Sequence, residues 1–185
     1  MFKVIAEQQQ RFSVEECCRI AKEVAEGVRA MHYDLTPQIL HRDLTPYNIL
    51  INEQGCVKIC DLGISTQKRS KGIQALSPIG HPEFKPPEVT LQQSYSKRCD
   101  VFTFGSFLYF LFTGSTPFHS EGYSGFEISR RFAEGRTPII PNEVPTCIAQ
   151  TIQKCWRMEC KNRPNFKKLA SVSYTHLTLP TSDLV

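Results

Sequence analysis

The sequence lacks an apolar run long enough to cross a membrane, an N-terminal signal peptide, an internal repeat and a low-complexity linker. Its most apolar stretch, 101–112, is well short of the ~20 residues that a membrane-spanning helix needs. A strong excess of one charge is also missing, because 22 Lys and Arg against 18 Asp and Glu leave only +4. We therefore expect no membrane and no nucleic acid among the partners, and the length suits one domain or one lobe.

The eight cysteines lack the paired two-residue gaps that are typical of a zinc site. Cys56 and Cys60 lie four positions apart, and Cys155 and Cys160 lie five apart. With ample apolar residues for a core, these side chains are expected to be free thiols rather than a disulfide framework. This favours a reducing compartment, the cytoplasm, with the nucleus as an alternative.

A helix is predicted over about 13–33. Ser13 followed by Glu16 is a capping-box pattern, which satisfies two of the exposed amides that open a helix. Apolar residues then recur at spacings of three and four, while charged residues take the other face. The apolar stripe consists of Val14, Cys17, Cys18, Ala21, Val24, Ala25, Val28 and Met31.

The remaining pattern predicts a small hairpin followed by more helices. Short β-type runs at 48–52 and 57–60 are joined by a turn that ends in Gly55. From 61 to 88 no periodicity is sustained, which indicates a long functional loop. A buried helix over 101–112 follows, in which Gly105 costs about 1 kcal/mol unless another element packs closely against it.

Two further helices are expected near 145–156 and from about Asn165, with the turn 161–164 between them. The fold class predicted from the pattern is therefore mainly α with a small β-hairpin.

The residues that suggest chemistry lie in two short strings. His41-Arg42-Asp43 is followed by Asn48, and Asp61-Leu62-Gly63 comes directly after the predicted hairpin. Two carboxylates and a carboxamide form the kind of oxygen ligand set that holds Mg²⁺ on a polyphosphate. Gly63 allows backbone angles that other residues reach only with strain.

These strings resemble the eukaryotic protein kinase family, and the resemblance runs from about Arg11 to Val172. The string that begins at His41 resembles the catalytic loop, and the string that begins at Asp61 is similar to the metal-binding triplet, with Leu in place of the usual Phe. Further similar motifs follow in the family's order, namely Gly80-His81-Pro82-Glu83-Phe84, Pro86-Pro87-Glu88, Asp100-Val101-Phe102-Thr103-Phe104-Gly105, Cys155-Trp156 and Asn162-Arg163-Pro164-Asn165-Phe166.

The resemblance implies roles for the first residues. Asp43 would accept the proton of a protein substrate's hydroxyl, and Asn48 and Asp61 would hold the Mg²⁺ ions that bridge the phosphates of ATP. ATP and Mg²⁺ are thus the implied cofactors, and a protein is the implied substrate. Without the motif context, Asp43 and Asp61 would be interpreted as solvated loop carboxylates.

The resemblance also implies structural and regulatory roles. Arg42 would bind a phosphate placed on the activation segment, with Ser65, Thr66, Ser70 and Ser77 as candidate acceptors. Glu88 and Arg163 would form a buried ion pair, and Asp100 would accept hydrogen bonds from the catalytic-loop backbone. The alternative for Asp100 is a carboxylate placed favourably near a helix N-terminus.

Two departures from the family pattern bear on activity. Thr45 stands where the serine/threonine branch has a lysine, and His81 stands where that branch has a threonine. The missing cation weakens the expectation of serine/threonine transfer, although 81–84 still favours it over tyrosine. A pseudokinase or scaffold lobe that acts as a docking module is the alternative function.

The resemblance covers the C-terminal lobe of a kinase and leaves the N-terminal lobe without a counterpart. Residues 1–12 are expected to be a remnant of the preceding segment, 13–172 the C-terminal lobe, and 173–185 an unrelated tail of disordered or artefactual sequence. The missing N-terminal lobe would be the partner that completes the nucleotide site, so the chain alone is expected to be an inactive fragment.

Overall fold

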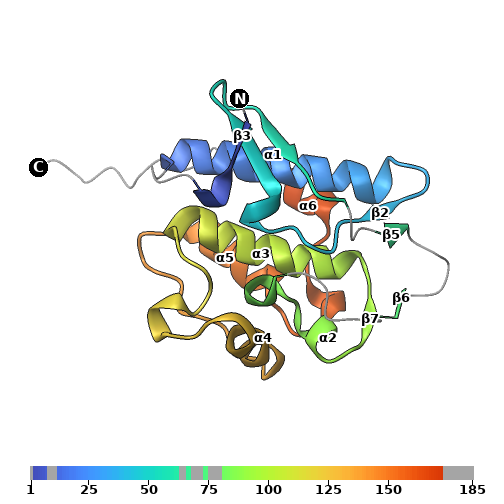
Figure 1. The fold of residues 1–185 in the computed structure, drawn as a ribbon, viewed down its shortest axis with the longest axis vertical. Helices are drawn as coiled ribbons and strands as arrows, with labels where there is room; N and C mark the ends of the chain where they lie inside the picture. The colour runs from blue at the N-terminus through green and yellow to red at the C-terminus, as the bar shows by residue number, and fades with distance from the viewer. Residues whose placement is uncertain (1, 8–11, 63–65, 68–72, 75–80, 173–185) are drawn as a thin grey trace, which may run out of the picture.

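The structure is a computed structural model of the chain and describes residues 2–7, 12–62, 66–67, 73–74 and 81–172 (Figure 1). Helices dominate the described residues, and the strands are short, as predicted. The α-helices are α1 (Val14–Tyr33), α2 (Pro87–Thr90), α3 (Lys97–Thr113), α4 (Gly125–Ala133), α5 (Thr146–Cys155) and α6 (Phe166–Ala170). The strands are β1 (Phe2–Val4), β2 (Ile39–Leu40), β3 (Ile49–Asn52), β4 (Val57–Ile59), β5 (Thr66–Gln67), β6 (Ile73–Gln74) and β7 (Ser94–Tyr95).

Helix α1 begins as its capping box predicts. The Ser13 hydroxyl accepts a hydrogen bond from the Glu16 amide at 3.2 Å, and the Glu16 carboxylate accepts one from the Ser13 amide at 2.8 Å. The predicted apolar stripe is largely buried, although Val14 is exposed. His32, near the end of the helix, is also fully buried.

The predicted hairpin is present and gains a third strand. Strands β3 and β4 pair antiparallel, and Gly55 in their turn has a φ of +78°. Strand β1 pairs with the other edge of β3, with Phe2 opposite Asn52, so residues before α1 contribute to the sheet. The sequence did not indicate this strand, because three residues are too few to show a periodicity.

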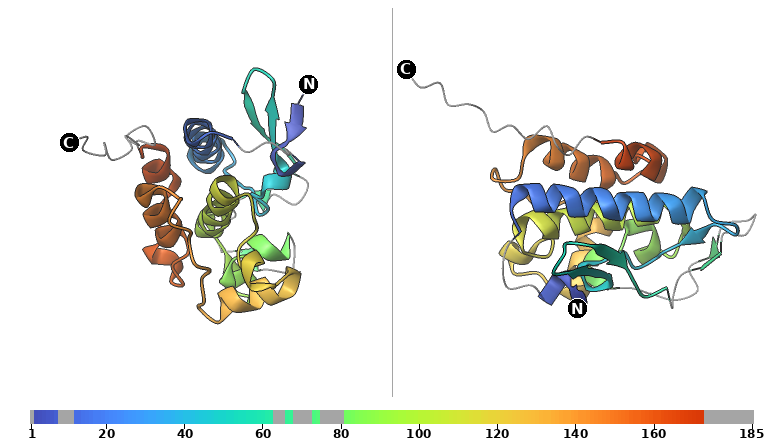
Figure 2. Two further views of the ribbon diagram at one scale, coloured as in Figure 1. Left: turned by 90° about the vertical axis from the view of Figure 1, so that its left-hand side faces the viewer. Right: turned by 90° about the horizontal axis from the view of Figure 1, so that it is seen from above.

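Helix α3 lies at the centre of the core, with α1 and α5 packed against it (Figure 2). Its aromatic side chains Phe102, Phe104 and Phe107 are fully buried. A Cβ built on Gly105 would lie 2.7 Å from the Cβ of Cys155. The glycine therefore permits the close approach of α5. As the sequence suggested, this close packing can offset the low helix propensity of glycine.

Helices α2 and α4 were not predicted, although α5 and α6 lie close to where they were expected. Within 61–88, the described residues include two short strands, β5 and β6, which pair with β2 and β7. All eight cysteines are free thiols, as expected. In the part of the chain that the structure describes, no helix is both long and apolar enough to span a membrane.

Candidate active site

Asp100 holds the loop that carries the first sequence string. This carboxylate, at the N-terminal end of α3, is fully buried and accepts hydrogen bonds from the backbone amides of His41 (2.9 Å) and Arg42 (2.8 Å). It also pairs with the ring of His32 at 2.7 Å and with the hydroxyl of Tyr95 at 2.9 Å. Burial acts to raise the pKa of Asp100, but the hydrogen bonds and the neighbouring histidine lower it below its ordinary value.

The backbone of this loop leaves the usual conformations at Arg42, which has a φ of +73°. Such a left-handed angle is uncommon for a residue with a Cβ and persists where the surroundings over-determine it. Here the two hydrogen bonds to Asp100 supply that constraint on the backbone around the angle. The expected contact between Asp100 and the loop backbone is therefore present in the structure.

Asp43 and Asn48 are joined directly. The amide nitrogen of Asn48 donates to the carboxylate of Asp43 and to its backbone carbonyl, both at 2.8 Å. Both residues are buried, with 7% of each exposed. Because the amide nitrogen is committed to Asp43, the amide oxygen of Asn48 remains the atom able to ligate a cation.

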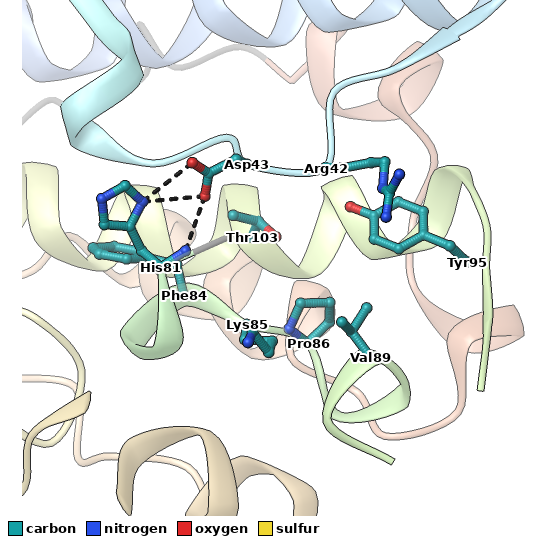
Figure 3. A pocket seen from close by; sticks show the side chains of 9 residues that line it. All are labelled: Arg42, Asp43, His81, Phe84, Lys85, Pro86, Val89, Tyr95 and Thr103. Atoms are coloured by element: carbon teal, nitrogen blue, oxygen red, sulfur yellow. Dashed lines mark hydrogen bonds and ion pairs between the residues drawn. The ribbon is translucent and has the colours of Figure 1, made fainter. Parts of the chain in front are cut away.

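His81 caps the other side of the Asp43 carboxylate (Figure 3). Its ring Nδ1 lies 3.2 and 3.1 Å from the two carboxylate oxygens, and its backbone amide donates to Oδ1 at 3.1 Å. The ring also stacks on Tyr47, with centroids 4.8 Å apart. The sequence marked His81 as a departure from the family pattern but did not predict that it would contact Asp43.

The contact shifts the pKa values of both partners. The hydrogen bond with Asp43 raises the pKa of His81 against the opposing effect of burial, and Glu83 and Asp61 add to the increase. Burial acts to raise the pKa of Asp43, but the hydrogen bonds of His81 and Asn48 lower it below its ordinary value. Asp43 is therefore held as a carboxylate, the form in which it can accept a proton.

Asp61 follows Cys60, whose backbone contacts the loop that carries His41, Asp43 and Asn48. The Cys60 amide donates to the carbonyl of Asn48 at 2.9 Å, and the Cys60 carbonyl is 3.1 Å from the ring of His41. Asp61 itself is exposed and has a φ of +58°. The structure thus joins Asp43 to Asn48 directly and ties Asp61 to them through the backbone, whereas Gly63 lies outside the described residues.

The oxygen atoms of Asn48 and Asp61 suit a magnesium ion. Mg²⁺ is usually bound by one or two carboxylates together with phosphate oxygens and water. Among the described residues no three His, Cys, Asp or Glu side chains gather into a complete metal site. One carboxylate and one amide are the kinds of ligand that would hold Mg²⁺ together with phosphate oxygens and water.

A small cavity of about 10 Å³ lies beside Asp43, between Arg42, His81 and Lys85 (Figure 3). Lys85 is only 5% exposed, and burial lowers its pKa although Asp43 opposes that shift. This buried lysine was not predicted, because it lies among prolines in a stretch without periodicity.

Arg42 lies close to the ring of Tyr95, with its guanidinium carbon 5.3 Å from the ring centroid. Its buried Nε has no hydrogen-bond partner among the described residues. The candidate phosphate acceptors Ser65, Ser70 and Ser77 lie outside the described residues, and of Thr66 only the backbone in β5 is described.

Glu88 and Arg163 form a buried ion pair, as expected. The two guanidinium nitrogens of Arg163 donate to the two carboxylate oxygens of Glu88 at 2.6 and 2.8 Å. The arginine side chain is 0% exposed and the glutamate side chain is 4% exposed. This two-point contact joins α2, at the end of the segment 81–90, to the turn before α6.

The fold and this site define the kinase class, and the comparison of sequences agrees. Residues 1–172 match the sequence model of the family described as "Protein tyrosine and serine/threonine kinase". The chain belongs to this family. The match includes residues 1–12, of which 2–7 form β1 and the turn after it, and it ends before 173–185, which lie outside the described residues.

Several curated proteins are similar to the chain. A probable serine/threonine-protein kinase of Dictyostelium discoideum is 41% identical over 149 residues, which are 80% of this chain and 16% of that protein. The probable serine/threonine-protein kinase SIS8 of Arabidopsis thaliana is 31% identical over 91% of this chain and 16% of its own length. The dual specificity protein kinase pyk3 of Dictyostelium discoideum is 37% identical over 71% of this chain and 10% of its own length. The chain therefore spans only a small part of each of these relatives.

Proposed function

We propose that the chain is the catalytic-loop part of an ATP-dependent protein kinase that transfers the γ-phosphate of ATP to a protein serine or threonine hydroxyl. The observation that carries this proposal is the Asp43–Asn48 pair, a buried carboxylate kept ionised beside an amide oxygen that is able to ligate a metal. Names of similar proteins support the choice of serine and threonine, and one of those relatives has dual specificity.

In this proposal each residue has a defined task. Asp43 orients the substrate hydroxyl and accepts its proton, while Asn48 and Asp61 hold magnesium. ATP would supply the γ-phosphoryl group and leave as ADP, and the Mg²⁺ held by these residues would neutralise the charge that develops during transfer. Asp100 keeps the loop in its strained shape, so the base is positioned before substrate binds.

A second function, a docking lobe without catalysis, is favoured by two residues. Thr45 supplies no cation beside the base, and its buried hydroxyl has no partner among the described residues. His81 occupies both oxygens of Asp43, so a substrate hydroxyl would have to compete with the imidazole for the same acceptor. The enzyme is preferred because Asp43 and Asn48 keep the arrangement that proton transfer requires.

The test is phosphate transfer from labelled ATP to a generic protein substrate, with the coding sequence immediately upstream of Met1 included if it encodes further kinase sequence. Asp43→Asn should lower the rate by about 10²–10⁴-fold, the usual contribution of a general base. Glu53→Gln removes a carboxylate in the same way at an exposed hairpin turn and should leave the rate unchanged. The 185 residues alone should show no measurable transfer, because binding of the α- and β-phosphates would depend on the N-terminal lobe, for which the chain has no counterpart.

Equal rates for the Asp43→Asn protein and the unsubstituted protein would contradict the assignment of the base. If the longer protein transfers no phosphate at all and still folds, the docking lobe becomes the better description. Robust, Asp43-dependent transfer by the 185 residues alone would contradict the proposal that the nucleotide site needs the N-terminal lobe as well.

A further inference from the structure

A basic pocket lies away from the candidate active site, where the ends of α3, α5 and α6 meet. It is open to solvent and has a volume of about 420 Å³. Helices α5 and α6, in orange and red, follow one another along one side of the molecule (Figure 2). The cationic residues that line the pocket together with the buried Arg163 are Arg98, Lys154, Arg157, Lys161 and Lys168.

Two of these cations are held in place by the backbone of the same region. A guanidinium nitrogen of Arg157 donates to the carbonyl of Asn162 at 3.0 Å, and one of Arg98 donates to the carbonyl of Arg163. Each guanidinium has five N–H donors in a planar fork, so most of its donors remain available. The pocket therefore presents positive charge from partly fixed positions, which lowers the entropy cost of binding an anion.

Negative charge that could balance the pocket is scarce. No lining residue is acidic, and Lys161 has an exposed ion pair with Glu159 at 3.2 Å. In the described part of the chain, Lys154 and Lys168 make no ion pair. Arg163 is paired with Glu88, so four lining cations, Arg98, Lys154, Arg157 and Lys168, are left without an ion pair in the described part of the chain. Gathering these like charges at one concave surface disfavours the folded state. A bound anion would remove that cost.

The lining indicates which kind of anion fits. Apart from the cations it contains two asparagines and Pro164, and it has no aromatic ring. Nucleobases and single-stranded nucleic acids are usually bound by stacking on aromatic rings, and peptide interfaces depend on apolar or aromatic anchors. A volume of this size matches small-molecule pockets, which range over about 300–1,000 Å³.

We propose that this pocket binds a compact small molecule that carries several phosphate groups and no base. Lys154 and Lys168, from α5 and α6, supply the mobile charges, and the two fixed guanidiniums supply directional donors. This site is separate from the proposed nucleotide site and does not depend on kinase activity.

The experiment measures binding of two probes, inorganic tripolyphosphate and inositol hexakisphosphate, to the full 185-residue chain by calorimetry. An acidic phosphopeptide and vesicles of anionic lipid are measured in the same way for comparison. Binding should weaken steeply as salt is raised, because ion pairs form on binding. Lys154→Glu with Lys168→Glu should weaken binding of both probes at least about tenfold, since each lost charge-assisted contact contributes on the order of that factor. The neutral pair Lys154→Gln with Lys168→Gln should give a smaller loss in the same direction.

The matched control is Lys22→Glu with Lys58→Glu, which makes the same change in net charge at exposed positions in α1 and β4. It should weaken binding less than about twofold, because the charges lie outside the pocket, and circular dichroism should show all variants folded. An equal loss in the control pair would overturn the proposal, because binding would then depend on net charge alone. The proposal would also be wrong if neither probe binds, or if only an acidic phosphopeptide or vesicles of anionic lipid bind.

Discussion

Replacing Arg163 by methionine is expected to lower the free energy of unfolding by about 3–5 kcal/mol, because the substitution leaves the buried carboxylate of Glu88 without its partner. Glu88 is only 3% exposed and would lose both of its hydrogen bonds to the guanidinium. Arg163 also donates to the backbone carbonyls of Arg157 (2.7 Å), Arg98 (3.0 Å) and Met158 (3.3 Å). Each buried group left unpaired costs about 1–3 kcal/mol, of which local relaxation recovers part.

The assay is equilibrium unfolding in urea followed by circular dichroism, for Arg163→Met, Glu88→Gln and the double variant. The double variant should cost less than the sum of the two single ones, because it strands no buried charge. Arg130→Met is the control, since the Arg130–Glu134 pair has 79% of the arginine side chain exposed. That pair should contribute less than about 1 kcal/mol.

The effect of pH on this difference follows from the pKa of Glu88. Burial acts to raise that pKa, but the hydrogen bond and charge of Arg163 lower it below its ordinary value. The pair therefore stabilises the folded chain above the unfolded pKa of about 4.3, and the contribution is lost as pH falls through the folded pKa. A loss below about 1 kcal/mol on Arg163→Met, or a difference between variant and unsubstituted chain that persists unchanged at acid pH, would refute this reasoning.

Two further predictions concern helix packing and the His81–Asp43 contact. Gly105→Ala should destabilise the chain by about 1–3 kcal/mol despite alanine's higher helix propensity, because the added Cβ would overlap the Cβ of Cys155. The control is Gly27→Ala, whose Cβ would meet the end of the Ile59 side chain. It should be neutral or stabilising in the same urea assay. An NMR titration of the His81 ring should give a midpoint above about 6.5, and Asp43→Asn should move it down. The stabilisation that this contact gives the folded chain is therefore fully present below the unfolded histidine pKa of about 6.5, and it is lost as pH rises through the folded pKa. A midpoint that is unshifted in both proteins would rule the contact out.

The sequence predicted those helices and strands that depend on residues close to one another along the chain. The capping box at Ser13 and the stripe after it placed α1 to within a residue, and the β-type runs around Gly55 predicted the hairpin. The long apolar run indicated a central helix, and α3 is that helix. In each case propensity, capping and burial favour the same structure, so neighbours along the chain are sufficient to predict it.

Elements that depend on contacts between distant residues were not predicted. Strand β1 pairs with β3 from the other side of α1, and no local pattern of three residues reveals a partner so far along the chain. The contact of His81 with Asp43 joins two loops, and its donors depend on backbone geometry that the sequence does not show. The cations of the basic pocket come from separate elements, so they gather only when the helices pack.

Asp100 connects the candidate catalytic loop to the helical core, because it bonds the loop backbone and also His32 of α1. One carboxylate without access to solvent binds two loop amides, a histidine from α1 and a tyrosine that precedes α3. A change in the shape of the loop is therefore costly, because it would remove two hydrogen bonds from a buried carboxylate and leave only His32 and Tyr95 as its partners. A substitution in this loop and a substitution at the contact between α1 and α3 therefore disturb the same few atoms.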